Sequence, residues 1–356
     1  MKAVVKTNRS RGIEIKDVEL PTLKENDVLV QVLAASICGS DLHMHEGMNA
    51  YEWVSTPVTL GHEFAGVVVE VGHKNHAHLI GKDVVINPYI PCGHCENCLK
   101  GQTNLCDHGK GSMSKVPAES LRYGFRENGG MAEYASIDYR NVLPLPEEVT
   151  IEVAGMLEAI GIGVRAIERA NILPGETAVV IGPGPIGLSM VASLSNYGFK
   201  QLIVTGLTKD KGRLALALEL GATDIVYVDD ENLLEAIAHK TNGNGVDHVF
   251  ETSGFNGSLT DAVRICKKGG EVLLIGISPQ ESTIATSEIV RGEIDIKGIY
   301  GVTEQTMKRA IAMAASGKYP YEKLITHTYA LEEAEAGFNA GIRKEAVKVI
   351  LKPSGE

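Results

Sequence analysis

Four cysteines lie close together in the first third of the chain: Cys92, Cys95, Cys98 and Cys106, with the spacing C-x2-C-x2-C-x7-C. Four thiolates can surround one tetrahedral Zn²⁺, and an iron–sulfur cluster takes the same ligands. Disulfides do not persist in a reducing compartment, and four free thiols at this spacing would invite oxidation. The spacing therefore predicts a closed, structural metal site, preferably zinc, in a lobe of about residues 91–107.

A second set of metal-binding side chains lies upstream of this lobe. Cys38 stands in the stretch SICGSDLH, and His62 and Glu63 stand in the stretch GHEF. A cysteine, a histidine and a carboxylate can hold a zinc ion with one vacant position, which is what catalysis requires. The spacing alone is equally compatible with a buried core cysteine and a turn histidine, so both interpretations stay open at this point.

A glycine-rich loop follows the apolar run Val179-Val180-Ile181. Its sequence, Gly182-Pro183-Gly184-Pro185-Ile186-Gly187, is G-x-G-x-x-G between an expected strand and an expected helix. The first glycine permits the tight turn, the second lets the backbone approach a pyrophosphate, and the third lets the helix lie close to the strand. The phosphates would lie at the helix N-terminus. We interpret the loop as a dinucleotide site; the alternative is a glycine turn without a ligand.

The residues after the next expected strand bear on which dinucleotide binds. An acid for the ribose diol is usual at this place, but Gly206 stands there, followed by Lys209, Lys211 and Arg213. Loss of the carboxylate beside cations suits a 2′-phosphate, so the sequence slightly favours NADP over NAD. The alternative is that these charges are solvated, and that Asp210 or a backbone group binds the ribose of NAD.

Two kinds of sequence pattern predict the strands and helices that position these residues. The first 150 residues contain short β-segments, whereas from about Ile151 apolar strands alternate with amphipathic helices. Such alternation predicts a parallel sheet covered on both faces. The tail from about Ile299 has two helices and a last strand that we expect to return to the first domain. The prediction is an α/β protein with a mainly β domain over 1–151 and 299–356 and a doubly wound cofactor domain over 152–298.

Composition excludes several classes of function. The formal net charge of −11 argues against a nucleic-acid partner. No apolar span is long enough to cross a bilayer, and the first residues lack an apolar signal region, so no membrane association and a cytoplasmic location are expected. The histidines at 45, 73, 76 and 78 are expected on the surface. Cys266 is expected to be an inert core thiol within the helix DAVRICKKGG.

Over essentially its full length the chain resembles the zinc-containing medium-chain dehydrogenase/reductase superfamily, and most of all its polyol (sorbitol-type) and threonine dehydrogenase branch. The stretches that carry the resemblance are SICGSDLH, GHEFAGVVVEVG, PCGHCENCLKGQTNLC, GGMAEYA, VIGPGPIGL and EAVKVILKP. It implies a GroES-like catalytic domain and a Rossmann cofactor domain. It also implies two zinc ions per subunit, one catalytic and one structural, and a homodimer or homotetramer.

The resemblance further implies residue roles. Cys38 and His62 match the catalytic zinc ligands, and either Glu63 or Glu158 would be the third. Ala159 departs from the family's Leu-Glu-Pro pattern at this point. Ser40 matches the hydroxyl that accepts the substrate proton, and His43 the end of the relay to solvent through the cofactor ribose. The implied reaction oxidises a secondary alcohol, a sugar alcohol or vicinal diol, to a ketone with hydride transfer to NAD(P)⁺.

Other functions compete with this interpretation. An L-threonine 3-dehydrogenase or another zinc alcohol dehydrogenase would use the same residues. A zinc-independent reductase on the same fold would lack Cys38, His62 and Glu63. A dinucleotide-binding structural protein would not need the zinc set, and a zinc-ribbon nucleic-acid module conflicts with the acidic balance. The segment from His108 to Asn128 is longer than the family's usual link, and we expect a lid, an oligomer contact or a tolerated loop there.

Overall fold

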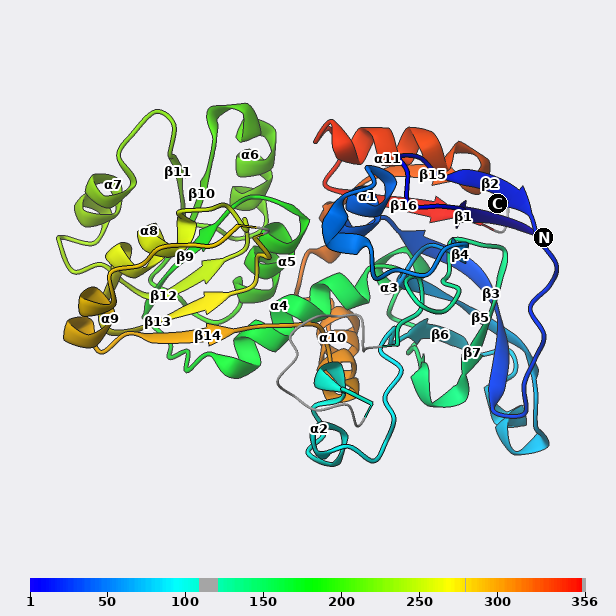
Figure 1. Cartoon of the computed structure of the whole chain (residues 1–356). Coiled ribbons are helices and arrows are strands. Elements are labelled where there is room, and N and C mark those ends of the chain that lie inside the picture. Colours follow the sequence, from blue (N-terminus) through cyan, green and yellow to red (C-terminus); the bar gives the residue numbers. More distant parts are fainter. Residues whose placement is uncertain (109–120, 279, 354–356) are drawn as a thin grey trace. The chain divides into compact units, whose positions relative to one another are not determined.

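The computed structural model describes residues 1–108, 121–278 and 280–353 (Figure 1). Most of the segment from His108 to Asn128 therefore lies outside the described residues. The chain forms two compact units. Unit 1 consists of Met1–Gly161, Val302–Gly317 and Ile325–Glu356, and unit 2 of Ile162–Gly301 and Lys318–Leu324.

Unit 1 is built on two sheets. One has the strand order β2-β1-β4, and the other has the order β15-β16-β3-β5-β6-β8 with β7 also pairing with β3. The strands are β1 (Lys2–Lys6), β2 (Glu14–Asp17), β3 (Asp27–Ser36), β4 (Val58–Thr59), β5 (Glu63–Val71), β6 (Asp83–Ile86), β7 (Tyr134–Asp138), β8 (Val142–Pro144), β15 (Ile325–Ala330) and β16 (Lys348–Lys352).

The helices of unit 1 are short. They are α1 (Gly39–His45), α2 (Glu96–Leu99), α3 (Ile151–Ala154), α10 (Glu304–Ala315), α11 (Ala334–Ile342) and the helical turns η1 (Asn49–Tyr51), η2 (Lys74–Leu79), η3 (Thr103–Leu105), η5 (Tyr139–Asn141) and η8 (Leu331–Glu333). The C-terminal strand β16 pairs antiparallel with β3, with Leu351 opposite Ala35. The tail thus contributes a strand beside the one that leads to Cys38.

Unit 2 contains a parallel sheet of six strands in the order β11-β10-β9-β12-β13-β14, which is the order of a Rossmann fold. The α/β fold expected from the sequence is therefore confirmed. Its elements are β9 (Thr177–Ile181), α5 (Pro185–Leu194), β10 (Gln201–Gly206), η6 (Thr208–Asp210), α6 (Lys211–Glu219), β11 (Asp224–Tyr227), α7 (Leu233–Lys240), β12 (Val246–Glu251), α8 (Ser258–Ile265), β13 (Cys266–Leu274), α9 (Thr286–Gly292), β14 (Asp295–Gly298) and η7 (Tyr321–Leu324).

Helix α4 (Leu157–Arg169) begins in unit 1 and ends in unit 2. From Ile151 the chain forms two helices, α3 and α4, with a break at Gly155, where a Cβ atom would lie 3.0 Å from that of Ala34. The break sets Leu157 and Glu158 at the start of a new helix.

Two expectations about single residues are wrong. Cys266 is buried, as expected, but it is not helical: α8 ends at Ile265, and Cys266 opens β13, where it pairs with Val246 of β12. His45 is buried rather than exposed. Its ring lies 5.4 Å from that of Phe338, and its Nε2 atom lies 3.1 Å from Glu335.

Within the part of the chain that the structure describes, no helix combines the length and apolar character needed to cross a membrane.

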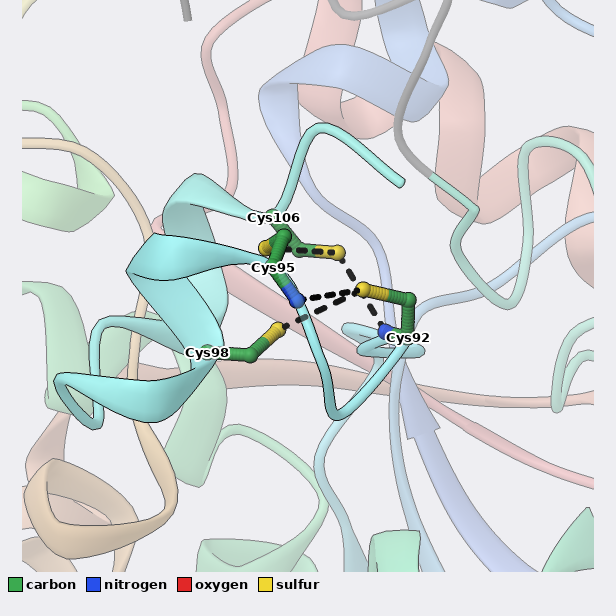
Figure 2. Close-up of side chains that lie close together, drawn as sticks. All are labelled: Cys92, Cys95, Cys98 and Cys106. Atoms are coloured by element: carbon green, nitrogen blue, oxygen red, sulfur yellow. Dashed lines mark hydrogen bonds between the residues drawn. The ribbon is translucent and has the colours of Figure 1, made fainter. Parts of the chain in front are cut away.

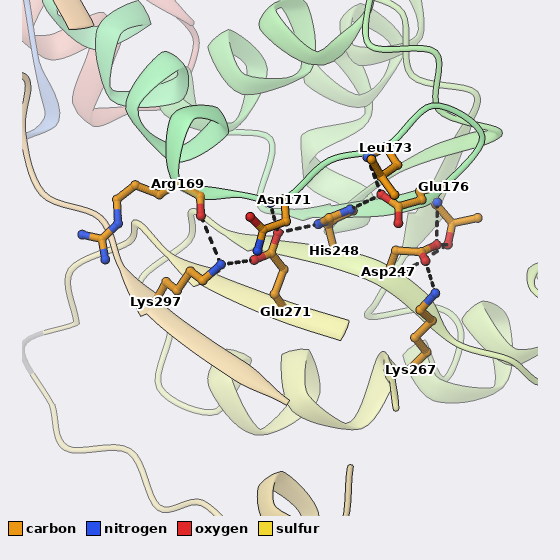
Figure 3. Close-up of polar contacts among 10 residues, drawn as sticks. Arg169, Asn171, Leu173, Glu176, Asp247, His248, Lys267, Glu271 and Lys297 are labelled. Carbon is orange, nitrogen blue, oxygen red and sulfur yellow. Dashed lines mark hydrogen bonds and ion pairs between the residues drawn. The ribbon is translucent and has the colours of Figure 1, made fainter. Parts of the chain in front are cut away.

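A buried histidine organises polar contacts in unit 2 (Figure 3). On β12, the Nδ1 atom of His248 lies 2.8 Å from a carboxylate oxygen of Glu271, and its Nε2 atom lies 2.7 Å from one of Glu176. Glu271 also accepts from the Asn171 amide and binds Lys297, while Glu176 accepts from the Leu173 amide. Two carboxylate partners favour the imidazolium, the form in which both ring nitrogens donate.

This arrangement predicts a loss of stability at alkaline pH. Burial alone would lower the pKa of His248, but its hydrogen bonds and attraction to Glu271 and Glu176 outweigh burial and raise the pKa. The stabilising contribution is therefore complete below the ordinary histidine pKa of about 6.5 and is lost as pH rises through the raised folded value. As the pH rises through this range, we expect the urea concentration at the midpoint of unfolding to fall in the wild type and to fall less in His248→Gln. Equal slopes of midpoint against pH in both proteins would contradict the prediction.

Candidate active site and metal centres

Cys38 lies where β3 gives way to α1. It is the N-cap residue of that helix, in an extended conformation with φ −93° and ψ 160°. The fully buried Asp41 turns back to accept a hydrogen bond from the Cys38 amide at 2.9 Å. Side-chain acceptance of a free amide at the first helical turn is what fixes a helix start, so Asp41 holds the cysteine in place.

Glu63 begins the neighbouring strand β5, and His62 directly precedes it. In the antiparallel pairing of β3 and β5, Ser36 lies opposite Glu63 and Ala35 opposite Phe64. Gly61 precedes them with φ +91°, and a Cβ atom there would lie 2.6 Å from a side-chain atom of Met131. The register therefore carries His62 and Glu63 to the same end of the sheet as Cys38.

The structure brings three predicted ligands together. The ligand atoms of Cys38, His62 and Glu63 all lie within 4.8 Å of one another. His62 and Glu63 are buried, and Cys38 is partly buried. Asp41 Oδ1 lies 3.7 Å from His62 Nδ1, so a carboxylate stands behind the imidazole, as is usual for metal-binding histidines. Sequence reasoning did not assign a role to Asp41.

Unpartnered buried atoms test whether a metal fits here. Asp41 Oδ1, His62 Nδ1, Glu63 Oε1 and Glu158 Oε2 are buried and make no hydrogen bond. Burial opposes protonation of His62, but Asp41 and Cys38 outweigh it and raise the pKa of its ring well above the ordinary value. Leaving buried polar atoms without partners costs free energy. A cation bound among them would give the carboxylate oxygens a partner. The residues present therefore fit a divalent metal.

Glu158 is the second residue of α4 and is 3% exposed. It lies outside the close group formed by Cys38, His62 and Glu63. Burial, with Glu63 acting in the same direction and His62 opposing, raises the pKa of Glu158 to about 7. The two carboxylates near this centre thus differ: Glu63 belongs to the group, and Glu158 is a buried acid beside it. Ala159, which replaces the family's proline, is buried within α4.

Lys348 on β16 was missed by sequence reasoning. It is 1% exposed, and its Nζ atom forms an ion pair with Glu63 Oε2, which also accepts from Ser36 Oγ. Burial raises the pKa of Glu63, but attraction to Lys348 and His62 outweighs it and lowers that pKa. The only sequence signal was a lysine inside the otherwise apolar run AVKVIL.

Ser40 and His43 lie one turn apart on α1, so they share a face of the helix. The Ser40 hydroxyl oxygen is buried and makes no hydrogen bond, whereas His43 is exposed. The His43 ring lies 5.7 Å from that of Tyr51. A buried hydroxyl followed by an exposed imidazole is compatible with the expected proton path.

Aromatic rings adjoin His62. The ring of Phe125 lies 4.8 Å from that of His62, and Trp53 stacks on Phe125 at 5.4 Å with an interplanar angle of 16°. The Arg122 guanidinium lies 4.7 Å from the centre of the Tyr89 ring and 5.7 Å from the centres of the Trp53 and Phe125 rings. These rings and this cation form one wall close to the group of candidate ligands.

The four cysteines of the lobe converge as the spacing predicted (Figure 2). Sγ atoms of Cys92 and Cys98 lie 4.0 Å apart, as do those of Cys95 and Cys106. Four Zn–S bonds of about 2.3 Å in a tetrahedron would place sulfurs about 3.8 Å apart. All four are free thiols. The amides of His94 and Cys95 outweigh burial and lower the pKa of Cys92 to about 6, whereas burial raises the pKa of Cys98 to about 12.

The glycine-rich loop of unit 2 has the form that a dinucleotide requires. Gly182 has φ +98°, and a Cβ atom on Gly187 would lie 2.0 Å from the Gly182 carbonyl oxygen. Gly184 is the N-cap of α5, Pro185 and Ile186 form its first turn, and a Cβ atom on Gly184 would meet nothing within 4 Å. Gly182 and Gly187 thus permit the close turn, and Gly184 leaves the backbone open to the approach of a pyrophosphate.

Gly206 ends β10 beside this loop. A Cβ atom there would lie 2.8 Å from Pro183 Cγ, so Pro183 occupies the space that an acidic side chain would need. Lys209 lies in η6, and Lys211 and Arg213 lie in the first turn of α6. Burial lowers the pKa of the Arg213 guanidinium. The predicted cations therefore follow directly on the strand end.

Comparison with known proteins agrees with both units. Residues 24–147 match the family model for the alcohol dehydrogenase GroES-like domain, and residues 185–316 match that for zinc-binding dehydrogenases. The sorbitol dehydrogenase of Bacillus subtilis is 32% identical over 99% of this chain and 98% of its own length. The L-threonine 3-dehydrogenase of Bacillus velezensis is 33% identical over 99% of each.

Solved structures show the same fold across the chain. A putative zinc-binding dehydrogenase from Sinorhizobium meliloti bound to NADP has a TM-score of 0.89, with 28% identity and 99% of each chain covered. An alcohol dehydrogenase from Escherichia coli CFT073 complexed with NADH gives the same TM-score, identity and coverage. The chain belongs to the zinc-containing medium-chain dehydrogenase/reductase superfamily, in its polyol and threonine dehydrogenase branch, and is an oxidoreductase that acts on CH–OH groups.

Proposed function

We propose that this protein oxidises a secondary alcohol of a sugar alcohol or other vicinal diol to a ketone. The observation that carries the proposal is the buried group of Cys38, His62 and Glu63, with unpartnered polar atoms where a zinc ion would bind. The sorbitol dehydrogenase relative supports a polyol, while the threonine dehydrogenase relative keeps L-threonine as the second candidate.

The chain's own residues would divide the work as follows. Cys38, His62 and Glu63 would hold the zinc ion, with Glu158 as the alternative carboxylate. A bound zinc ion would supply Lewis acidity, and the nicotinamide would supply the hydride acceptor. The Ser40 hydroxyl would accept the substrate proton, and the exposed His43 would deliver it to solvent. Trp53 and Phe125 would orient the carbon chain of the substrate beside His62.

The test is a panel of sorbitol, 2,3-butanediol, L-threonine and ethanol with each cofactor, followed by nicotinamide absorbance. We expect the highest kcat/KM with sorbitol or the diol, and loss of that activity after treatment with a zinc chelator. Highest activity with L-threonine would replace the polyol proposal by the second candidate. Activity that survives complete removal of zinc would overturn both.

We further propose NADP as the preferred cofactor. Support comes from Gly206, which leaves no acid at the strand end, and from Lys209, Lys211 and Arg213 after it. One observation opposes it: Asp229 accepts two hydrogen bonds of 2.8 Å from Thr208 and adds a carboxylate beside the same loop.

Substitution of Arg213 tests this preference. We expect wild-type kcat/KM to be higher with NADP than with NAD. Arg213→Gln should lower the NADP value by about tenfold or more, because hydrogen bonds to charged groups contribute about 1.5–3 kcal/mol, and leave the NAD value unchanged. Lys200→Gln, at an exposed lysine of the same unit, is the matched control. Steady-state kinetics that favour NAD in the wild type would refute the preference.

We also propose two zinc ions per subunit, the second held by Cys92, Cys95, Cys98 and Cys106. The mutual distances of their sulfur atoms support it. A homodimer or homotetramer and a cytoplasmic location are proposed from the family resemblance.

A further inference from the structure

Lys348 is a buried cation at the candidate metal centre. It is 1% exposed, and besides its ion pair with Glu63 its Nζ atom lies 3.4 Å from the carbonyl oxygen of Ile37, the residue before Cys38. A buried charge is costly unless it is paired. Its pairing with Glu63 therefore ties the lysine to the group of candidate ligands.

The backbone fixes where this lysine lies. Strand β16 pairs antiparallel with β3, with Ile350 opposite Ser36, and the Ile37 amide donates to the Val349 carbonyl at 3.0 Å. These bonds hold the start of β16 against the segment that leads to Cys38. The pairing of β16 with β3 therefore fixes the position of the Lys348 backbone.

The two oxygens of Glu63 have different surroundings. Oε2 is taken by Lys348 and by the Ser36 hydroxyl. Oε1 makes no hydrogen bond and lies 4.0 Å from His62 Nε2. The carboxylate is therefore oriented so that a single oxygen is available to a metal ion.

Lys348 also changes the charge of the centre. Its ammonium forms a buried ion pair with Glu63, and it also lies beside the segment that leads to Cys38. A second cation at this range weakens the binding of a divalent ion, because like charges repel most strongly where water is excluded.

We propose that Lys348 is a positioning residue that keeps Glu63 as a one-oxygen ligand and holds zinc affinity below its maximum, so that one coordination position stays open for substrate. Catalytic zinc sites need such an open position. The statement about substrate rests on the proposed reaction, whereas the statement about zinc affinity rests only on zinc binding at Cys38, His62 and Glu63.

The test compares Lys348→Met with Lys348→Arg. Zinc affinity is measured by competition with a chromophoric chelator, and kcat with the best alcohol of the panel. Without the ammonium, only the Ser36 hydroxyl still binds Oε2 of Glu63, so this oxygen is easier to recruit to the metal, and the repulsion is gone. We expect Lys348→Met to bind zinc about tenfold or more tightly while kcat falls by about tenfold or more. Lys348→Arg keeps the charge and should restore both values toward the wild type.

Opposite changes in affinity and turnover distinguish this role from a structural one. A variant that is merely destabilised would bind zinc more weakly, and weaker or unchanged zinc binding in Lys348→Met would overturn the inference. If that variant does not fold by circular dichroism, Lys348→Gln tests the charge alone, since its amide can still donate to Glu63 without a charge, and zinc affinity should again rise. If the wild type binds zinc but oxidises no alcohol, the proposed function fails while the affinity measurement still decides the role of Lys348.

Discussion

Replacing His62 by alanine or Cys38 by serine is expected to lower kcat/KM for the alcohol by about three orders of magnitude or more. Both residues belong to the group whose ligand atoms lie within 4.8 Å of one another, and Asp41 stands behind His62. Lewis acidity at such a centre contributes several kcal/mol to catalysis, and each 1.36 kcal/mol corresponds to about a factor of ten in rate. Steady-state kinetics at saturating cofactor provide the measurement.

Cofactor binding separates a catalytic defect from a folding defect. The glycine-rich loop and the cations after β10 belong to unit 2, whereas Cys38 and His62 belong to unit 1. Both variants should therefore bind the reduced cofactor as the wild type does, by fluorescence titration. Cys266→Ser is the matched cysteine control, because Cys266 lies outside both groups of candidate metal ligands. Turnover near the wild-type rate in either His62→Ala or Cys38→Ser would show that this centre does not perform the chemistry.

The cofactor unit could be predicted from the sequence because its patterns are local. The strands β9 and β10 are short, mainly apolar runs, each followed by a helix, and the glycine loop lies between β9 and α5. The strand β14 could not be predicted. Its residues, Asp295–Gly298, are mostly exposed and polar, and only pairing with β13 makes them a strand. Cys266 was misplaced for the same reason, since its pairing with Val246 is not a local property.

The residues of the candidate metal sites also fall into those that the sequence could predict and those that it could not. The spacing of the four cysteines predicted their convergence, because every ligand comes from one short segment. Cys38 follows β3 and His62 precedes β5, so their proximity rested on family resemblance until the register of these two strands placed them together. Lys348 and Asp41 could not be assigned, because a single charged residue in a sequence looks solvated. Only the folded structure shows that both are buried, that Lys348 contacts Glu63 and that Asp41 contacts Cys38.

Replacing Cys95 by serine is expected to have the second large effect, on stability rather than on the chemistry. Cys95 is buried, and its Sγ atom lies 4.0 Å from that of Cys106. Structural zinc sites contribute about 10–16 kcal/mol to folding in isolated zinc-binding peptides, so loss of one thiolate should unfold the lobe and lower the melting temperature.

Metal analysis of Cys95→Ser should find about one zinc per chain instead of about two. Cys38→Ser should lose the other zinc, with its activity, while the lobe stays folded. The contrast between the two variants is informative because the same substitution is made at both sites, so a general effect of removing a thiol cannot explain opposite outcomes. Iron in the wild-type protein would contradict the zinc assignment, because the same four thiolates can hold an iron–sulfur cluster. Unchanged zinc content in Cys95→Ser would show that the four cysteines do not form a metal site.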